Sequence, residues 1–590
     1  MNNKKIYLSI GIISVIILTL SITYAWFKWT SNSTNITFNV EDLGITYTGD
    51  DINIKSSLYP TIYMDNKDNI IHNFSIKKTT NTDVYLKISL DIIELPSELN
   101  EVSFVWNLYK EGTSIAKGDF KNATVGSDLI LTPYEMISNN PTSYTLYIWI
   151  DGTMDNPISM GNKSFSFKLK LESSQEDYTT KEECFSFNKT TNTITGYLCY
   201  EGNEDNLETI TDIVIPSSID GVEVKKIGYG AFRSKGITSV IMPDTVTDIA
   251  TLAFAWDKIS IVVLPKKLET IGSRAFESNN LTSIDFPITL TEIGGGAFTT
   301  NNITNVKIPK NVTKIESAIF SNNHQLQNII ISEENTSYSS NNNVIIENAT
   351  NRLVQGSISS IIPYGVKTIG NSAFKGMKIK NIDIPDSVTV IEEGAFSGCS
   401  LTDIILPDGI TRIENTVFYN KPISNIKFPK NLKSIGESAF WNSGFITLEI
   451  PSTVTQIEAS AFKRTRIKNL ILNEGIETIK KEAFYASNIT SLTIPSTLTT
   501  IEESAFSYNK ITSIYLKENS KLATLGDKAF SSSSTYYINY SDNTNLTTIY
   551  NLSGKSLDWN LAITGASGTA FVSGTVTTDD GRTVTITTSE

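Results

Sequence analysis

The side chains that could carry out chemistry are few. The 590-residue sequence has two histidines, His72 and His324, and three cysteines, Cys184, Cys199 and Cys399. Metal sites and nucleophilic triads need several such groups held close together. We find no His-Glu-x-x-His motif, no Gly-x-Ser-x-Gly motif with triad partners, and no spare histidine. We therefore predict no catalytic residues, no metal site and no cofactor, and we interpret His72 as an imidazole on a surface loop.

Two cysteines have a spacing that suggests a structural role. Cys184 and Cys199 flank a predicted hairpin that turns through residues 189–192, so they lie nearly opposite one another. In an oxidising exterior they could form a cross-strand disulfide, although the geometry is demanding. Two free buried thiols are the alternative. The absence of a further Cys or His nearby disfavours zinc.

The charge balance excludes one class of partner. Acidic residues outnumber basic ones by 62 to 49, which gives a net charge of −13. Nucleic acids and anionic membrane surfaces attract a basic face. We therefore predict that the chain binds no nucleic acid.

The N-terminus predicts export. Lys4 and Lys5 precede an uncharged, mostly apolar run over residues 6–27, which is long enough to cross a bilayer as a helix. We assign residues 1–28 to a signal anchor or transmembrane helix that leaves the rest of the chain outside. The alternative is cleavage after Ala25, because small residues occupy the required positions, and the protein would then be secreted.

Residues 29–175 predict a β-sandwich. Short β-rich runs alternate apolar and polar residues, as in 144–150 and 165–171, and turn residues such as Asp151-Gly152 separate them. Residues 176–228 follow as a hairpin connector and N-terminal repeat cap, which includes a short hairpin at Asp220-Gly221.

The rest of the chain is organised by a 22-residue period. The stretch 281–302 reads LTSIDFPITLTEIGGGAFTTNN, and variants of it recur along the chain. The phenylalanine of its Ala-Phe pair recurs at 22-residue intervals, with one gap of 54 and a last step of 24. Such a period predicts a solenoid. We assign residues 229–535 to the repeats, with an insertion at about 332–359, and residues 536–590 to a C-terminal cap and tail hairpin.

The repeat letters have separate structural roles. In 281–286, Ile284 and Phe286 point to the inside of the coil by strand alternation, and Pro287 ends the strand. The Ala-Phe pair is expected to be buried, with Ala allowing close approach of the backbone. The fold class is therefore mainly β. The insertion predicts an extended hairpin that projects from one edge, either as a specific contact or as a tolerated surface loop.

The repeat pattern resembles the BspA-like bacterial leucine-rich repeats over residues about 205–535. The shared landmarks are Ile-Pro, Ile-Gly and Ala-Phe, as at Ile308-Pro309, Ile271-Gly272 and Ala275-Phe276. The resemblance implies a cell-surface protein, several relatives being implicated in adhesion, with no catalytic residues in the repeat. It also implies that Cys399 is a small buried filler.

The N-terminal region resembles the TasA/camelysin-type exported proteins. The residues that carry this resemblance are 23–27 (TYAWF), Phe38-Asn-Val, Tyr147–Gly152 and the closing strand 165–171. The resemblance implies a surface or matrix β-sandwich.

We predict that the outward-facing strand positions bind an extracellular protein of a host or neighbouring cell. A mixed strip of this kind suits a broad protein contact better than a small-molecule pocket. A solvated sheet without a ligand is the alternative at these positions. For the whole chain, the alternatives are a structural matrix or fibre component built on the N-terminal sandwich and, most weakly, an exported hydrolase. The predicted outward positions are Ile241, Val263, Asp285, Lys307, Ile330, Asp383, Ile405, Lys427, Glu449, Ile471, Thr493 and Tyr515.

Overall fold

The structure is a computed structural model of the whole chain. It describes residues 23–25, 36–40, 45–49, 60–61, 70–78, 85–95, 104–111, 113–120, 123–125, 128–137, 140–151, 166–174, 179–201, 209–420, 422–531, 546–578 and 581–589. The chain falls into two compact units, the first built mainly from residues 1–248 and the second mainly from residues 288–590.

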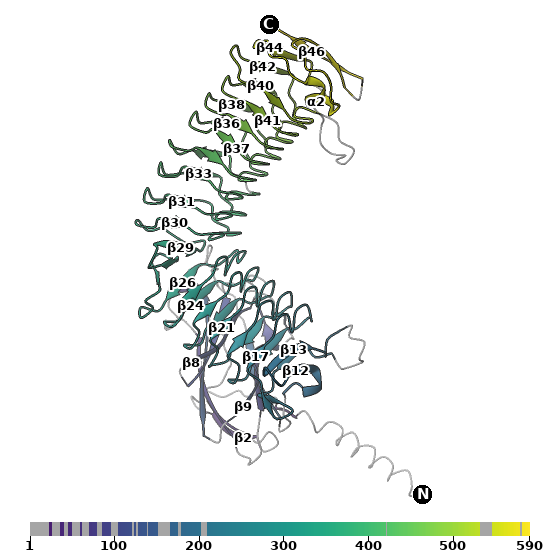
Figure 1. Ribbon diagram of the computed structural model, residues 1–590. Helices are drawn as coiled ribbons and strands as arrows, with labels where there is room; N and C mark the ends of the chain where they lie inside the picture. The colour runs from purple at the N-terminus through teal and green to yellow at the C-terminus, as the bar shows by residue number, and fades with distance from the viewer. Residues whose placement is uncertain are drawn as a thin grey trace. The chain divides into compact units, whose positions relative to one another are not determined.

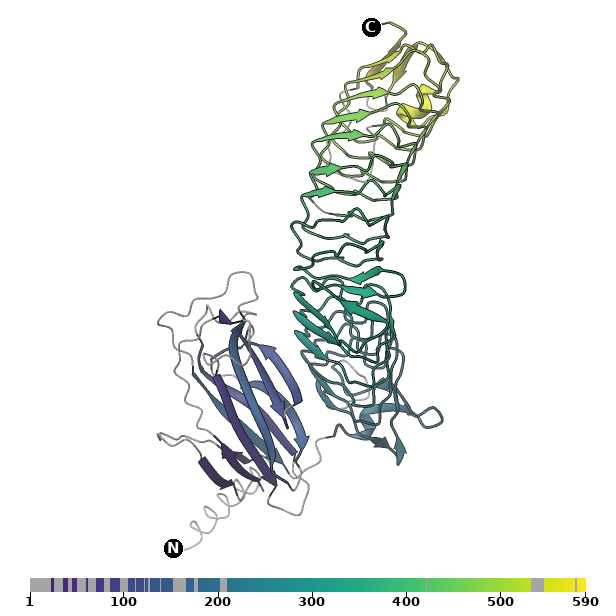
Figure 2. The same cartoon turned by 90° about the vertical axis from the view of Figure 1, so that its left-hand side faces the viewer.

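The N-terminal region forms two largely antiparallel sheets (Figure 2). The first has the order β1 (Thr23–Ala25), β11 (Ser166–Ser174), β6 (Tyr85–Glu94), β9 (Asp128–Met136). The second has the order β2 (Ile36–Val40), β3 (Ile45–Gly49), β5 (Ile70–Lys78), β10 (Thr142–Asp151), β7 (Phe104–Lys110), β8 (Thr113–Asp119), with β4 (Pro60–Thr61) parallel to β10. Alternate residues such as Tyr144, Leu146 and Ile148 of β10 enter one core.

The prediction for His72 is wrong. It lies in β5 and is 3% exposed, with its ring 5.6 Å from that of Phe74. Burial lowers the pKa of His72 to about 4, so the imidazole is neutral at physiological pH. Because β5 is paired on both sides by β3 and β10, strand alternation turns His72 inward.

The predicted membrane segment, residues 1–28, lies outside the described residues except for β1. Thr23–Ala25, which we expected at the end of a helix, pair with β11 as a strand. Among the residues that the structure describes, no helix has the length and apolar character to cross a membrane.

Most solenoid turns contribute one outer strand and one short strand (Figure 1), but the turns that contain residues 361–363 and 383–385 have no outer strand. The outer strands are β14 (Asp212–Val214), β18 (Ser239–Ile241), β20 (Ile261–Val263), β22 (Ser283–Asp285), β24 (Asn305–Ile308), β26 (Asn328–Ile331), β32 (Asp403–Ile405), β34 (Asn425–Lys427), β36 (Thr447–Ile450), β38 (Asn469–Leu472), β40 (Ser491–Ile494), β42 (Ser513–Leu516) and β44 (Thr548–Asn551). The short strands are β17 (Lys226–Ile227), β19 (Asp248–Ile249), β21 (Thr270–Ile271), β23 (Glu292–Ile293), β25 (Lys314–Ile315), β30 (Thr368–Ile369), β31 (Val390–Ile391), β33 (Arg412–Ile413), β35 (Ser434–Ile435), β37 (Gln456–Ile457), β39 (Thr478–Ile479), β41 (Thr500–Ile501) and β43 (Thr524–Leu525). The predicted mainly-β solenoid is confirmed.

The Ala-Phe pairs form the spine of the solenoid. Successive phenylalanine rings stack in parallel, for example Phe276 on Phe298 at 5.4 Å and 4° and Phe462 on Phe484 at 5.2 Å and 5°. The backbone follows the rings, because most of the Phe N–H groups donate to the carbonyl oxygen of the residue before the next Phe, usually Ala, as Phe484 N does to Ala505 O at 2.8 Å.

A left-handed residue lies two positions before each Phe of the array, and another lies two positions after most of them. Leu252, Arg274 and Glu482 have φ of 60°, 55° and 56° at the first position. A left-handed conformation costs a non-glycine residue about 1–2 kcal/mol. The turns tolerate it because N–H groups at these positions also donate to the next turn, as Arg274 N does to Gly295 O at 2.9 Å. The side-chain types there vary, so the sequence did not reveal this feature.

Both ends of the array are closed by elements that do not repeat. The start is a hairpin of β12 (Phe185–Asn188) and β13 (Thr193–Tyr197), preceded by the short helix η3 (Glu182–Cys184), and a disulfide joins Cys184 to Cys199 with the Cα atoms 5.1 Å apart. A second small hairpin, β15 (Ser218–Ile219) and β16 (Val222–Glu223), turns at Asp220-Gly221.

At the other end, carbonyl oxygens of α2 (Trp559–Thr564) accept hydrogen bonds from the backbone N–H groups of the last spine turn. Lys528 N donates to Leu561 O and Phe530 N to Ala562 O, both at 2.9 Å, and Trp559 is fully buried. The hairpin of β45 (Gly574–Thr577) and β46 (Thr583–Thr587) pairs with β44.

The insertion is a second starting hairpin rather than a projecting one. It forms β27 (Tyr338–Ser340), β28 (Ile345–Glu347) and β29 (Arg352–Gln355), and Tyr338, Val344 and Ile345 are buried. Its contacts repeat those of the first hairpin: Gly370 N donates to Leu353 O at 2.8 Å, as Gly228 N does to Ile194 O at 2.7 Å. A hairpin of the same kind therefore starts both the first and the second array of repeats.

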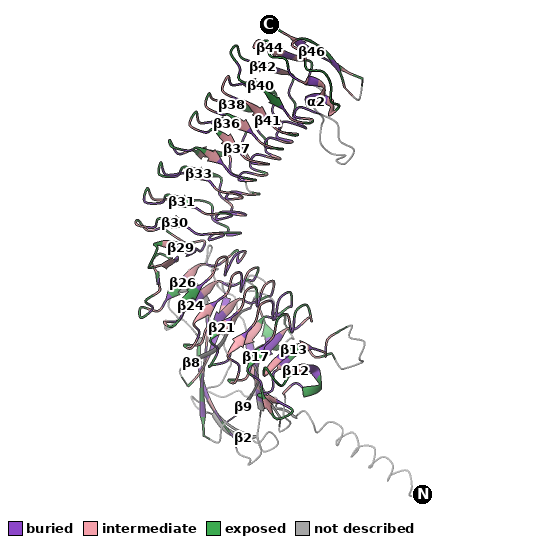
Figure 3. Ribbon diagram, viewed as in Figure 1, coloured by how far each residue is buried: buried purple, intermediate pink, exposed green. Residues whose placement is uncertain are grey.

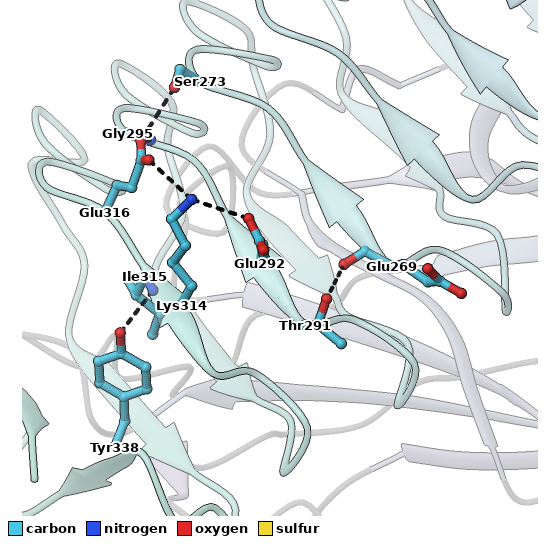
Figure 4. A network of polar contacts seen from close by, with 9 residues as sticks. All are labelled: Glu269, Ser273, Thr291, Glu292, Gly295, Lys314, Ile315, Glu316 and Tyr338. Atoms are coloured by element: carbon cyan, nitrogen blue, oxygen red, sulfur yellow. Dashed lines mark hydrogen bonds and ion pairs between the residues drawn. The ribbon is translucent and has the colours of Figure 1, made fainter.

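Two side chains join the arrays at this point. Tyr338 ends the first short-strand ladder, because its hydroxyl oxygen accepts Ile315 N–H at 2.8 Å (Figure 4). Beside it, Lys314 lies between Glu292 and Glu316 at 3.1 and 3.6 Å. Gln355, fully buried, bridges the spine.

The Gln355 amide takes the place of a direct backbone bond. Its Oε1 accepts Phe320 N–H at 3.2 Å and its Nε2 donates to Ala373 O at 2.8 Å. In regular turns the Phe N–H reaches the next Ala carbonyl itself. The side-chain amide thus spans the extra distance that the inserted hairpin creates.

We predict that Gln355→Leu destabilises the solenoid by about 1–3 kcal/mol, because Phe320 N–H is left buried without an acceptor while Ala373 O keeps its bond from Gly356 N. Urea unfolding followed by circular dichroism measures the change. The matched control is Gln456→Leu, whose partly exposed amide bonds only to Glu458 and whose loss should change stability by less than about 0.5 kcal/mol. Equal stability of the two variants would contradict the bridging role.

Candidate functional site

We call the twelve predicted outward positions, which occur once in a turn of the repeats, the outward row. Each of the twelve is exposed or half-buried, whereas their strand neighbours are mostly buried (Figure 3). Three isoleucines are the most exposed apolar members: Ile330 at 55%, Ile405 at 65% and Ile471 at 45%. Ile330 pairs in register with Lys307, and Ile471 with Glu449.

Our prediction missed one member of the row within the array. Ile361 is 65% exposed and belongs to the turn that follows the inserted hairpin. Tyr364 of the same turn is 85% exposed, but it follows Pro363 and lies outside the row. Ile361 precedes Ile362-Pro363, and Pro363 lies 22 residues before Pro385, so the Ile-Pro landmark was present in the sequence. The phenylalanine spacing also indicates this position, because Ile361 lies 13 residues before Phe374, as Asp383 does before Phe396. Tyr550, which stacks on Tyr515 at 4.5 Å, extends the row beyond the predicted end.

Polar side chains beside the row bond from turn to turn. Asn328 Nδ2 donates to Asn305 Oδ1, and Asn425 Nδ2 to Asp403 Oδ1, both at 2.6 Å. These bonds fix side chains that would otherwise be mobile, so the exposed isoleucines stand on an ordered surface. Asp285 of the row forms an ion pair with Lys117 Nζ at 2.8 Å.

Electrostatics are local and mixed in sign. Burial opposes ionisation of Glu474, but hydrogen bonds from Lys517, Ser496 and Thr497 outweigh it and lower the pKa of Glu474 to about 2. Within the residues that the structure describes, no three His, Cys, Asp or Glu side chains gather closely enough to hold a metal ion.

A buried polar side chain three residues after many of the spine phenylalanines holds neighbouring turns together. Asn323 makes three bonds there: Oδ1 accepts Ile303 N–H, and Nδ2 donates to Phe298 O and Phe320 O, all at 2.9 Å. Cys399 occupies the same position, is 1% exposed, and its thiol contacts Phe374 O at 3.0 Å, which agrees with the small buried filler that the resemblance implied.

Asp257 replaces this asparagine in one turn. Its Oδ1 accepts Lys235 N–H and Ile237 N–H at 2.7 and 3.2 Å, but its buried Oδ2 has no hydrogen-bond partner among the described residues. Oδ2 corresponds to the amide nitrogen that donates to two carbonyl oxygens in other turns. Burial raises the pKa of Asp257 to about 6, against the opposing effect of those N–H groups and of the Lys235 charge.

The repeats match a known family. Residues 225–344, 354–464 and 433–553 match the BspA type leucine-rich repeat region, in six copies, and these segments cover more than half of the chain. The chain belongs to the BspA-type leucine-rich-repeat proteins. The match begins at residue 225, so the TasA/camelysin resemblance of the region before it stays a prediction.

Solved structures of other leucine-rich-repeat proteins are similar to this BspA-type chain. A leucine-rich repeat protein from Eubacterium ventriosum is 23% identical, with 60% of this chain and 92% of that chain covered and a TM-score of 0.40. A leucine rich cell surface protein from Faecalibacterium prausnitzii is 21% identical, with 62% and 98% covered and a TM-score of 0.31. The pneumococcal vaccine antigen PcpA is 18% identical, with 53% and 88% covered and a TM-score of 0.34. No curated protein matches the chain.

We predict that Asp257 makes stability depend on pH. The pKa of Asp257 is higher in the folded than in the unfolded chain. The contribution of the protonated carboxyl group to the free energy of unfolding is therefore complete below about pH 4 and is lost as pH rises to about 6, by up to roughly 3 kcal/mol. Asp257→Asn restores the missing donor, so it should stabilise the protein at pH 7.5 and remove this slope.

Urea unfolding at pH 5 and pH 7.5 measures the slope in both proteins. Exposed Asp386→Asn is the control and should leave the slope unchanged. An identical slope in wild type and Asp257→Asn would contradict the assignment.

Proposed function

We propose that this protein is a non-enzymatic protein of the bacterial cell surface that binds another protein through the outward row. The observation that carries the proposal is a row of strongly exposed isoleucines on a face whose polar neighbours bond from turn to turn. Exposed apolar side chains on an ordered surface favour contact with a partner. The exported N-terminus predicted from the sequence supports a surface location, as does the similar Faecalibacterium protein described as a cell surface protein.

The chemistry of the row favours a protein partner. Lys307 and Lys427 alternate with Asp285, Asp383 and Glu449, so the row has neither the basic stripe that nucleic acid needs nor one dominant sign. Protein interfaces combine apolar anchors with a polar, charged rim in this way. Adhesion to a host or neighbouring cell is the role we propose for that contact.

The most exposed part of the row lies where the two arrays meet. Ile330, Ile361 and Ile405 belong to turns on either side of the second starting hairpin, with Asp383 between the last two. We propose that these three isoleucines are the anchors of the interface.

We predict that Ile361→Asp and Ile405→Asp each weaken partner binding at least tenfold, because each removes an apolar anchor and adds a charge that must be desolvated. The measurement is adhesion of host or community cells, and binding of their purified surface proteins, to the immobilised full chain. Val390→Asp is the matched control, because Val390 is 42% exposed but lies on a short strand away from the outward row. Binding lost in the control and kept in both row variants would place the contact elsewhere.

A further inference from the structure

Among the described residues the outer ladder is interrupted between β20 and β22, between β34 and β36 and between β38 and β40, and a cavity lies at the second of these gaps. β32 pairs with β34 and β36 pairs with β38, but in the described part of the chain no backbone ladder joins β34 to β36. The same turns remain joined elsewhere: β33, β35 and β37 form one ladder, and Phe418 N donates to Ala439 O at 2.9 Å. The turns therefore separate only on their outer side.

Two aromatic side chains lie at this gap. Phe445 is buried at a position where the turns on either side have Ile423 and Ile467, and Phe428 stands where they have Leu406 and Ile450. Both rings meet the spine ring of Phe440 edge-on, Phe445 at 5.5 Å and Phe428 at 6.1 Å. Both side chains line the cavity between the two turns.

The opening is a slot that runs along the strands. It has a volume of about 450 Å³ and is lined by residues 424–428 of one turn and by Phe445, Thr447, Leu448, Glu449 and Pro451 of the next. The last backbone bond before the strands part is Gly444 N to Ile423 O at 2.8 Å. A Cβ on Gly444 would lie 2.9 Å from Pro422 O, so glycine permits this close start.

The slot presents the two kinds of group that an extended peptide needs. The facing edges of β34 and β36 offer backbone N–H and C=O groups that no neighbouring strand pairs, and such edges recruit added strands. Between them lie the aromatic rings of Phe428 and Phe445, while Lys427 and Glu449 stand outside with opposite charges. Alternation along a strand would place every second side chain of a peptide on the rings and the others between these charges.

We propose that the slot between β34 and β36 binds an extended peptide segment of a partner protein, which pairs with both strand edges and places an apolar side chain against Phe428 and Phe445. This inference rests on the protein-binding role proposed above and specifies the form in which the partner is bound. The occupied slot would make β32, β34, the peptide, β36 and β38 one continuous sheet.

The chain's own outer strand supplies a probe. A fluorescein-labelled, acetylated and amidated peptide with the sequence of residues 424–429, Ser-Asn-Ile-Lys-Phe-Pro, has the alternation that the slot fits. Fluorescence anisotropy with the full chain should show saturable binding. Methylation of the peptide's isoleucine and phenylalanine backbone nitrogens should weaken binding at least tenfold, because these groups can then no longer pair.

A matched pair of variants locates the binding. Thr447→Arg places a long charged side chain in the slot and should weaken peptide binding at least tenfold. Ser491→Arg makes the same change at the equivalent exposed position of β40, which is paired with β42, and should stay within twofold of wild type. Melting curves followed by circular dichroism test whether both variants fold. If Thr447→Arg does not fold, Glu449→Lys replaces it as the slot variant.

Four outcomes would overturn the proposal. The first two are no saturable binding of the peptide to the wild-type chain and equal binding by Thr447→Arg. The third is equal binding of the methylated peptide, which would mean that only a side chain inserts, and the fourth is a self-associated chain that the peptide dissociates, which would make the occupant a second copy. Partner binding that Ile405→Asp abolishes while the peptide fails to bind would reject the slot and retain the outward row. Peptide binding without any effect of the row variants on partner binding would reject the row.

Discussion

The structure depends on one repeated interaction, the hydrogen bond from a spine Phe N–H to the carbonyl oxygen of the residue before the next Phe, which is usually Ala. This bond and the stacked rings hold turns together where the backbone adopts left-handed conformations that are unfavourable in isolation. No turn satisfies its own groups, so each is stable only on a neighbour. The ends must therefore be covered, and α2 accepts the last N–H groups with its own carbonyl oxygens.

The same requirement explains the junction of the two arrays. Inserting a starting hairpin interrupts the spine, and a buried Phe320 N–H without an acceptor would be unfavourable. Gln355 and Tyr338 supply an amide and a hydroxyl at the required places. An array can thus restart in the middle of a solenoid if side chains reproduce the bonds that the backbone no longer reaches.

The sequence predicted those parts of the fold that depend on side-chain type at a fixed spacing. The phenylalanines of the Ala-Phe pairs and most inward strand positions, such as Ile284, are buried as their apolar character indicates, while Phe286 is half-buried. The left-handed positions escaped prediction because backbone bonding, and not side-chain chemistry, selects them, and Leu252, Arg274 and Glu482 have nothing in common. His72 was misplaced because a polar residue in a paired strand follows alternation rather than hydropathy. Gln355 carried no signal, since its role exists only once the two arrays are stacked. Which outward residues contact a partner depends on that partner, so the predicted binding role of the row remains a prediction.

The outer face can open because the spine, and not the outer sheet, holds the turns. The ladder missing between β34 and β36 would contribute a few hydrogen bonds, each of about 1 kcal/mol net, and water can solvate the exposed groups instead. A comparable gap in the spine would leave buried groups unsatisfied and remove the ring stacking, so it would be far less favourable. The outer face can therefore open at one turn while the spine bonds of the adjacent turns persist. Changes in the residues of the outer face therefore alter the binding surface with little effect on the spine interactions that stabilise the solenoid.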